Sequence, residues 1–379
     1  MAIYKIFPTQ DATLYSEYPN MNTGLDEIIE ASTYVKNSKG QVSRYLVKFS
    51  TSEISNIIST KTSNDEWTAN LRNFKAVVTG LNLDTQLLFY PVSGNWGMGT
   101  GRYLDSPLVT NGTSWNWLDY SGSALWPTTS FPTYVTASWS NDVEGGGNWY
   151  TGSNLLLNVT QSQTFTYANN KDINVDVKST VETWYSYSLN AADGFENNGF
   201  IVKQTDENEF VNNLNNQKTF RFFSIDTHTI YPPQLEFKWN DYIFNTGSSN
   251  NTILPQIESF ISIYNNAGTY YSQSIPRLRF AAMPKYPDRV FQTASLYSTN
   301  YYLPESQSLY AVKDTETNEF VIDFDSEYTR ISSDATSSYF DLYMNGLEPE
   351  RYYTVLVKTS IGGTTKVFDE DIMFKVAKG

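Results

Sequence analysis

Residues 18–32 read YPNMNTGLDEIIEAS, and this stretch decides how the first strands of the chain are connected. Pro19 and Asn20 begin an irregular connection, and Asn22 and Gly24 are residue types that can adopt a positive φ. The acids that follow alternate imperfectly with apolar residues, as expected where the next strand enters a sheet. The stretch therefore predicts the first crossover of a β-sandwich rather than a catalytic loop.

Strand patterns extend outward from this crossover. SRYLVKFS (43–50), INVDVK (173–178) and PQLEFKWN (233–240) each alternate apolar and polar residues, which predicts strands with one buried face. Short runs of this kind, bounded by Gly, Pro, Asn or Asp, are typical of a sandwich or barrel. Two short helices are expected as well, at 50–60 and at 178–187, the second capped by Ser179 or Thr180.

Composition and charge exclude several classes of function. The 379 residues are 40% hydrophobic and 16% aromatic, and only 17% are charged. The formal net charge of −14 repels phosphate backbones and anionic membranes, so we expect neither nucleic acid nor membrane as a partner. Cysteine is absent, which excludes disulfides and thiolate metal sites. The sequence shows no signal-peptide pattern and no apolar run long enough to span a membrane, so synthesis in a host cytoplasm is expected.

The C-terminal part carries its own fold signals. Gly, Ser and Asn cluster without periodicity in residues 240–255, which indicates a domain boundary near 245. In GLEPERYYTVLVK (346–358), the spacing Leu347-x-Pro349-x-x-x-Tyr353 is that of a tyrosine corner, in which the Tyr hydroxyl bonds to the backbone a few residues upstream. Hairpin turns are predicted at 314–318 and at Gly362-Gly363.

Eight segments in order along the first 240 residues resemble the DNRLRE-type jelly-roll module, a family related to carbohydrate-binding modules. They are QDATLYSEYPNMNTGLDEIIEAS, SRYLVKFS, NWGMGTG, TNGTSWNW, GGGNW, INVDVKSTVETWY, NNGFIVKQ and PPQLEFKW. Met98 stands where the family commonly has an acidic residue, and Lys48 where Arg is usual. The tyrosine-corner segment resembles a fibronectin type III or immunoglobulin-like sandwich.

These resemblances imply an all-β chain, with an N-terminal jelly-roll β-sandwich followed by a C-terminal immunoglobulin or fibronectin III-like β-sandwich. We expect the jelly roll in residues 1–240, a linker with an extra hairpin or interface arm in 241–295, and the second sandwich in 296–379. The two-module plan and the Tyr- and Asn-rich composition resemble a virion structural protein of tailed bacteriophages.

Catalytic chemistry finds little support in the sequence. The densest acidic groups are at 323–327 and 369–371, and in a strand Asp323, Asp325 and Glu327 would share one face. We interpret that face as a solvated edge that discourages pairing with other strands. His228 is the single histidine and is interpreted as structural or at the surface. We therefore predict no enzyme, no catalytic residues and no cofactor.

Tryptophan and calcium are the two binding hypotheses. Six tryptophans fall between residues 96 and 149, namely Trp96, Trp115, Trp117, Trp126, Trp139 and Trp149. We favour a role in the core or an interface, and keep Trp96, Trp115, Trp117 and Trp149 as glycan candidates. Asp11, Asn22 and Asp26 are close in sequence and are candidate ligands of a structural Ca²⁺, with a structural turn as the favoured interpretation.

The predicted function is that of a non-enzymatic phage virion component, in the tail, the neck or collar, or on the capsid surface. It would act by packing against other virion proteins and against copies of itself. The alternative is a module that binds host-surface glycan, on a tail fibre or a capsid decoration.

Overall fold

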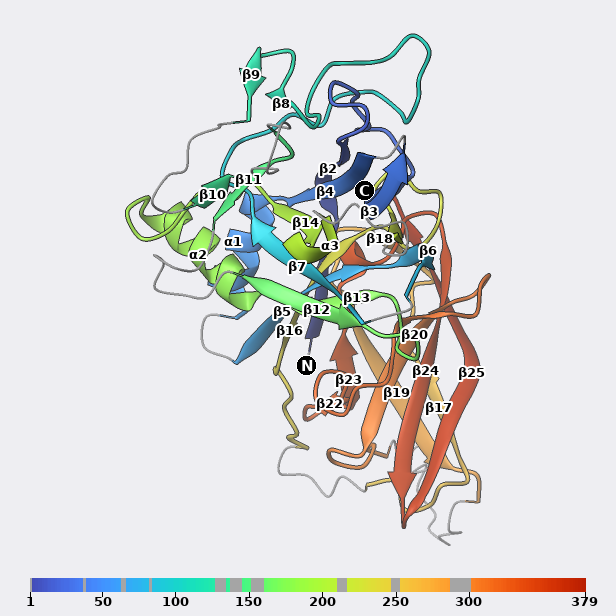
Figure 1. The fold of residues 1–379 in the computed structure, drawn as a ribbon. Helices are drawn as coiled ribbons and strands as arrows, with labels where there is room; N and C mark the ends of the chain where they lie inside the picture. Colours follow the sequence, from blue (N-terminus) through green and yellow to red (C-terminus); the bar gives the residue numbers. More distant parts are fainter. Residues whose placement is uncertain are drawn as a thin grey trace, which may run out of the picture. The chain divides into compact units, whose positions relative to one another are not determined.

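The computed structural model describes residues 2–36, 39–62, 66–81, 84–126, 134–136, 145–150, 160–209, 217–246, 253–286 and 301–379. The fold is mostly β, with several sheets and few helices (Figure 1). Two compact units divide the chain. We call Ile6–Ser63 with Thr68–Glu236 the N-terminal unit, and Met1–Lys5 with Asn64–Trp67 and Phe237–Gly379 the C-terminal unit. No helix in the described residues is long and apolar enough to cross a membrane.

The largest sheet belongs to the N-terminal unit and has the strand order β12-β7-β14-β4-β3-β15-β6, with β2 also paired to β4. Its strands are β2 (Pro8–Tyr15), β3 (Ile28–Lys36), β4 (Lys39–Phe49), β6 (Lys75–Thr79), β7 (Thr85–Pro91), β12 (Gln161–Phe165), β14 (Phe200–Gln204) and β15 (Lys218–Phe223). Residues 18–32 connect β2 to β3 and enter β3, so the prediction that this stretch joins two strands is confirmed, and both strands belong to the same sheet.

A second sheet has the order β1-β16-β5-β13. Its strands are β1 (Ala2–Ile6), β5 (Trp67–Asn73), β13 (Ile173–Asp176) and β16 (Gln234–Trp239). The boundaries between the two units fall within β1, β5 and β16. Two small sheets pair β8 (Trp117–Asp119) with β9 (Ala124–Leu125) and β10 (Tyr134–Thr136) with β11 (Asn148–Tyr150).

The predicted one-sided burial of residues 43–50 is wrong. Tyr45 and Val47 are buried as expected, but Arg44 and Leu46 on the opposite face of β4 are buried too. Leu46 packs in an apolar cluster with Ala12, Leu14 and Trp115. The sheet is therefore covered on both faces in this region, and a polar Arg in the alternation did not mark the solvent side. In β13 the alternation holds, since Ile173 and Val175 are buried between exposed neighbours.

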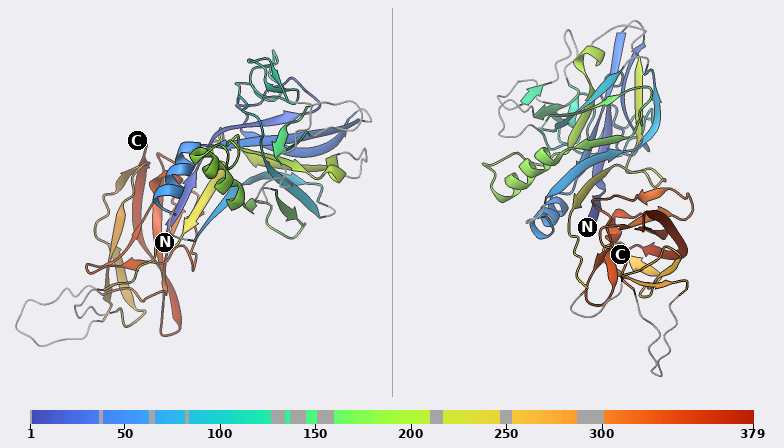
Figure 2. Two further views of the ribbon diagram at one scale, coloured as in Figure 1. Left: turned by 90° about the vertical axis from the view of Figure 1, so that its left-hand side faces the viewer. Right: turned by 90° about the horizontal axis from the view of Figure 1, so that it is seen from below.

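Both predicted helices form, and they lie side by side (Figure 2). They are α1 (Thr51–Thr60) and α2 (Lys178–Leu189), beside a short α3 (Asp206–Glu209). Ser50 caps α1 by accepting a hydrogen bond from the Glu53 N–H at 3.3 Å. The predicted cap of α2 at Ser179 or Thr180 is wrong, because the N-cap position is Val177, which makes no side-chain cap hydrogen bond.

The C-terminal unit consists of two sheets that enclose one core. One sheet has the order β17-β19-β23-β22, and the other has the order β18-β25-β24-β20-β21. Their strands are β17 (Ser259–Ile263), β18 (Thr269–Tyr271), β19 (Arg277–Pro284), β20 (Ser308–Asp314), β21 (Phe320–Ile322), β22 (Ser332–Ser333), β23 (Ser338–Asp341), β24 (Tyr352–Ile361) and β25 (Thr364–Ala377), with a 3₁₀ turn at Met344–Gly346. Strands β17 to β19 fall in the segment 241–295 that the sequence analysis set apart.

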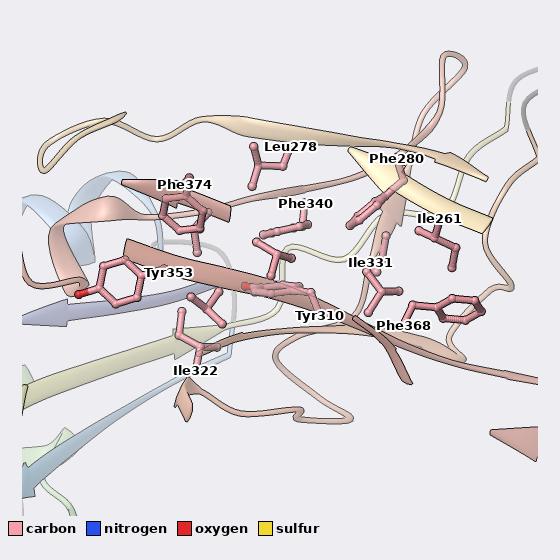
Figure 3. Close-up of a cluster of buried hydrophobic side chains, with 14 of the residues drawn as sticks. Ile261, Leu278, Phe280, Tyr310, Ile322, Ile331, Phe340, Tyr353, Phe368 and Phe374 are labelled. Atoms are coloured by element: carbon pink, nitrogen blue, oxygen red, sulfur yellow. The ribbon is translucent and has the colours of Figure 1, made fainter. Parts of the chain in front are cut away.

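Side chains from both sheets meet in the core of the C-terminal unit (Figure 3). Tyr310 of β20 and Phe340 of β23 stack there with ring centroids 3.9 Å apart, and Phe280 of β19 stacks on the other side of Phe340 at 5.6 Å. This arrangement is β-sandwich-like, as predicted.

Three local predictions in the C-terminal unit are confirmed. The Tyr353 hydroxyl donates to the Glu348 carbonyl at 3.0 Å, which is the bond expected of a tyrosine corner. Asp314 accepts the Glu316 and Thr317 N–H groups in the turn between β20 and β21. The two-residue turn between β24 and β25 has positive φ at Gly362 and Gly363, which glycine adopts without a steric penalty.

Candidate functional site

Asn22 holds together three loops of the N-terminal unit. Its side-chain N–H groups donate to the carbonyls of Met98 at 2.7 Å and Thr113 at 2.8 Å. Its side-chain oxygen accepts the N–H groups of Gly24 at 3.2 Å and Gly101 at 2.8 Å. The segments NMNTG, GMGTG and TNGTS, which are far apart in sequence, therefore meet around one amide.

Neither Asn22 nor Gly24 has a positive φ, so the suggested role of these residues in the backbone turn is wrong. Gly24 is needed for a different reason. A Cβ atom at this position would lie 2.2 Å from the Met98 carbonyl oxygen. The glycine permits a close approach of two backbone segments, which no local sequence pattern reveals.

Beside these loops the N-terminal unit has an open pocket of about 450 Å³. It is lined by residues from β2, β3 and β15, from the loop between β2 and β3, and from the loop between β7 and β8. These residues are Tyr15, Asp26, Glu27, Ile28, Glu30, Arg102, Tyr103 and Arg221. We call this the tyrosine pocket. Only Asp26 is a site candidate on sequence grounds, because the other residues carry no motif and come together only through loop packing and the pairing of β3 with β15.

Two tyrosine rings give the pocket an aromatic surface. Tyr103 is 43% exposed, and its ring centroid lies 5.0 Å from that of Tyr15. Tyr15 is only 5% exposed, and its hydroxyl makes no hydrogen bond with the described residues. The exposed ring of Tyr103, supported by Tyr15, therefore offers an aromatic surface to a ligand in the pocket.

Charged groups of both signs surround these rings. The Arg221 guanidinium donates to the Glu30 carboxylate at 2.7 Å, and about half of the Arg221 side chain remains exposed. Burial raises the pKa of Asp26 to about 6, although the Tyr103 N–H and the Arg102 guanidinium act against this rise. The pocket can therefore accept hydrogen bonds at its carboxylates and donate them from its guanidiniums.

Asp11 lies in the interior next to this region. Burial raises the pKa of its carboxyl to about 8, and repulsion from Asp226 and Asp26 acts in the same direction. One carboxyl oxygen accepts the Ile225 N–H at 2.7 Å, and the other has no hydrogen-bond partner. At neutral pH the carboxyl is therefore mostly protonated, because burial without a neighbouring cation disfavours the charged form.

The structure separates the three calcium candidates by environment. Asn22 uses its side-chain oxygen for two backbone N–H groups, Asp11 is fully buried, and Asp26 lines the tyrosine pocket. Within the described ranges, no three His, Cys, Asp or Glu side chains are grouped so that they could hold a metal ion. Asn22 has no lone pair to spare for a cation in this arrangement, and the calcium hypothesis stays a prediction for the two aspartates.

Four of the clustered tryptophans are buried. Trp96, Trp115, Trp126 and Trp149 pack in one apolar cluster with residues of β2 and β4. The Trp96 and Trp126 indole N–H groups donate to the carbonyls of Asn198 and Ser114. Trp117 is partly exposed, and its N–H donates to the Asn20 side-chain oxygen at 3.0 Å. Trp139 lies outside the described residues.

Sequence reasoning missed a buried ion-pair network next to these tryptophans. Arg44 donates to both carboxylate oxygens of Glu209, at 2.7 and 3.2 Å, and its guanidinium lies 5.0 Å from the Trp115 ring and 5.5 Å from the Trp149 ring. Lys203 is also buried and lies 3.2 Å from the same carboxylate. The two partners of the Arg44–Glu209 pair are 165 positions apart, so no local pattern could have predicted the pair.

The acidic group at 323–327 has a structural role in a turn, and the group at 369–371 lies in β25, where Asp369 accepts a hydrogen bond from Lys313 at 3.0 Å. The predicted strand through Asp323, Asp325 and Glu327 is wrong, because β21 ends at Ile322 and Asp325 instead accepts the N–H groups of Glu327 and Tyr328. His228 is at the surface, as expected, with 91% of its side chain exposed.

Comparisons with known proteins add no family. No family model and no curated protein matches the chain. Among solved structures, a DUF4785 family protein from Legionella pneumophila aligns with 99% of this chain and 62% of its own, at 9% sequence identity and a TM-score of 0.18. That score is too low to indicate a shared fold.

Proposed function

We propose that this chain is a non-enzymatic structural component of a tailed-bacteriophage particle, which acts by packing against other virion proteins. The proposal rests on two compact β units and on the net charge of −14, which disfavours nucleic acid and anionic membranes as partners. Its site in the tail, the neck or collar, or on the capsid surface is left to experiment.

The strand order of the C-terminal unit supports an immunoglobulin-like sandwich. Taking β17, β19, β20, β22, β23, β24 and β25 as strands A, B, C, D, E, F and G gives one sheet A-B-E-D and a second that contains G-F-C. The tyrosine corner then precedes strand F, where such sandwiches have it. For the N-terminal unit we propose a jelly-roll sandwich, on the ordered segments and the long β4 that pairs with β2, β3 and β14.

The observation that carries the proposed function is the burial of the tryptophans. Aromatic rings that could have formed a recognition platform instead fill the interior of the N-terminal unit around the Arg44–Glu209 pair. This use of large side chains packs the described loops of residues 92–116 and 145–147 into the compact N-terminal unit, as expected of a building block rather than of an adaptable binding surface.

Antibody labelling of purified phage particles tests this proposal. Gold-labelled antibody against the recombinant chain is expected to decorate one fixed position on each particle in negative-stain images. Particles of the phage that encodes the chain, prepared without the gene, give the matched control. Absence of label from disrupted as well as intact wild-type particles would contradict the proposal.

A second candidate function, glycan binding, is favoured by the tyrosine pocket. The exposed face of Tyr103 can stack on a sugar ring, while the carboxylates and guanidiniums around it can pair with sugar hydroxyls. We therefore propose this pocket as the glycan site in place of the buried Trp96, Trp115 and Trp149, while Trp117 stays a partly exposed candidate.

Glycan-array binding tests the second candidate. Tyr103→Ala is expected to abolish binding, and Arg102→Ala to weaken it, because each removes a group that faces the pocket. Tyr167→Ala is the control. Tyr167 belongs to the same unit and is 89% exposed, but it does not line the pocket. Binding that persists in Tyr103→Ala would rule out this pocket as the site.

A further inference from the structure

The sheet β17-β19-β23-β22 of the C-terminal unit has one face in the core and one face toward solvent. We define its outer face by Phe260, Tyr264, Arg277, Arg279, Met283 and Tyr339. Phe260 is 52% exposed and Met283 is 44% exposed, and the two are direct register partners across β17 and β19. A pair of large apolar side chains thus lies side by side in water.

The charged residues of the outer face neutralise one another. Arg277 makes two hydrogen bonds to Asp341, at 2.8 and 2.9 Å, and Arg279 makes two to Asp334, at 2.9 and 2.7 Å. Both guanidiniums also lie against the Tyr339 ring, at 4.0 and 5.5 Å from its centroid. Two cations and two anions leave no net charge on this face.

The large exposed or partly exposed side chains of the outer face are of kinds that are common at protein–protein interfaces. They are Phe260, Tyr264, Met283 and the two arginines, and the four strands contain neither Lys nor Glu. Aromatic residues, Met and Arg are enriched at interfaces, whereas Lys and Glu are depleted there. Strand β17 is also the last strand of its sheet within the described residues, and it has no charge or proline to discourage association.

We propose that the outer face is the docking site of a second copy of this chain, related to the first by a two-fold axis. Two copies repel each other in general, because each has a net charge of −14. A two-fold contact sets the same surface against itself, so a charged surface would add to that repulsion. The outer face does not add to the repulsion, because its two arginines pair with two aspartates of the same copy. This inference names a surface for the self-packing part of the proposed function and rests on it.

The size of the face sets the expected strength. The strands β17, β19, β23 and β22 have five, eight, four and two residues, and at about 3.4 Å per residue and about 4.8 Å between strands they give a footprint on the order of 300 Å². Since a standard interface buries about 800 Å² per partner, we expect a weak dimer with a dissociation constant on the order of 100 µM to 1 mM.

Analytical ultracentrifugation of the full chain over a concentration series tests the inference. We expect a monomer–dimer equilibrium whose dissociation constant rises about tenfold or more in Phe260→Glu and in Met283→Glu, because each variant places two buried charges at the two-fold contact. Val367→Glu is the matched control, since Val367 is 47% exposed on β25 of the other sheet. Raising the salt concentration is expected to strengthen the dimer, because it screens the general repulsion.

A monomer at all concentrations, or a dimer that both outer-face variants leave unchanged, would overturn the inference. A dimer that Val367→Glu weakens as much as they do would overturn it too. Circular dichroism of each variant separates loss of the dimer from loss of the fold.

The proposed function and this inference can fail separately. If the chain is found in particles but is monomeric in solution, the self-docking face fails while the structural role stands. If the chain forms the specific dimer but is missing from particles, the structural role fails while the self-docking face stands.

Discussion

Arg44 shows how much one residue of this chain depends on partners from distant segments. Its guanidinium is buried with the Glu209 carboxylate and between two tryptophan rings. A buried charge is tolerated only when it is paired and hydrogen-bonded. The alternating pattern of β4 predicted a solvent-facing Arg, and only the pairing of β4 with the rest of the unit reveals its environment.

Removing the partner of Arg44 is expected to be costly. Glu209→Gln leaves the buried Arg44 without a countercharge and takes one of the two carboxylates from Lys203, which keeps Asp206, so the free energy of unfolding should fall by about 3–5 kcal/mol. Glu182→Gln is the matched control, because Glu182 pairs with Lys178 on the surface of α2 and should have a far smaller effect. Urea unfolding followed by tryptophan fluorescence measures both, and equal losses would contradict the account.

Asp11 predicts a pH dependence of stability. Its pKa is about 8 in the folded chain against 3.8 for the ordinary group. Between these values the folded state holds a proton that the unfolded state has released, so stability is greatest below the unfolded pKa and falls as pH rises, by at most about 1.4 kcal/mol per pH unit.

Urea unfolding at pH 5 and pH 8 measures this dependence. The wild-type chain is expected to be less stable at pH 8, and Asp11→Asn, which stays neutral and keeps an oxygen for the Ile225 N–H, should flatten the difference. The same slope in Asp11→Asn as in the wild type would show that the pKa of Asp11 is not its source.

At the scale of elements, the loop that joins β2 to β3 is fixed by contacts rather than by its own turn preferences. Gly24→Ala is expected to lower the free energy of unfolding by about 2 kcal/mol or more, because a Cβ atom would meet the Met98 carbonyl oxygen at 2.2 Å. Gly97→Ala, in the same loop cluster, is expected to change it by less than about 0.5 kcal/mol, since its Cβ would lie 3.6 Å from Asp119. Thermal unfolding of the two variants compares them, and an unaffected Gly24→Ala chain would refute the close packing.

The tyrosine corner offers a second test at this scale. Tyr353→Phe removes the hydrogen bond to the Glu348 carbonyl and should destabilise the C-terminal unit by about 1–2 kcal/mol. Tyr352→Phe is the control on the neighbouring residue, whose side chain is mostly exposed. Urea unfolding followed by circular dichroism should separate the two variants, and indistinguishable curves would mean that the corner contributes nothing.

These elements also show how far the sequence reaches. The helix α1, the Gly362-Gly363 turn and the corner at Tyr353 were predictable because each depends on residues within a few positions of one another. The tyrosine pocket was not, because Tyr15, Arg102 and Arg221 meet only through loop packing and strand pairing. A core position, the favoured interpretation of the clustered tryptophans, holds for Trp96, Trp115, Trp126 and Trp149, but the packing of Trp115 and Trp149 around Arg44 is not visible in the sequence.

At the scale of the whole molecule, the account is that of two rigid β units that present surfaces for packing. The N-terminal unit uses its large aromatic side chains internally, and the C-terminal unit exposes aromatic and methionine side chains on an outer face without net charge. A chain that works in this way needs many identical contacts and no turnover, so it should occur at a fixed number of copies in each assembly.

Quantitative mass spectrometry of purified phage particles tests the central claim most directly. The account predicts peptides of this chain in the particles at a constant, symmetry-related ratio to the major capsid and tail proteins, retained after washing at high salt. A chain that is missing from the particles, or present only in variable traces that washing removes, would contradict the structural role.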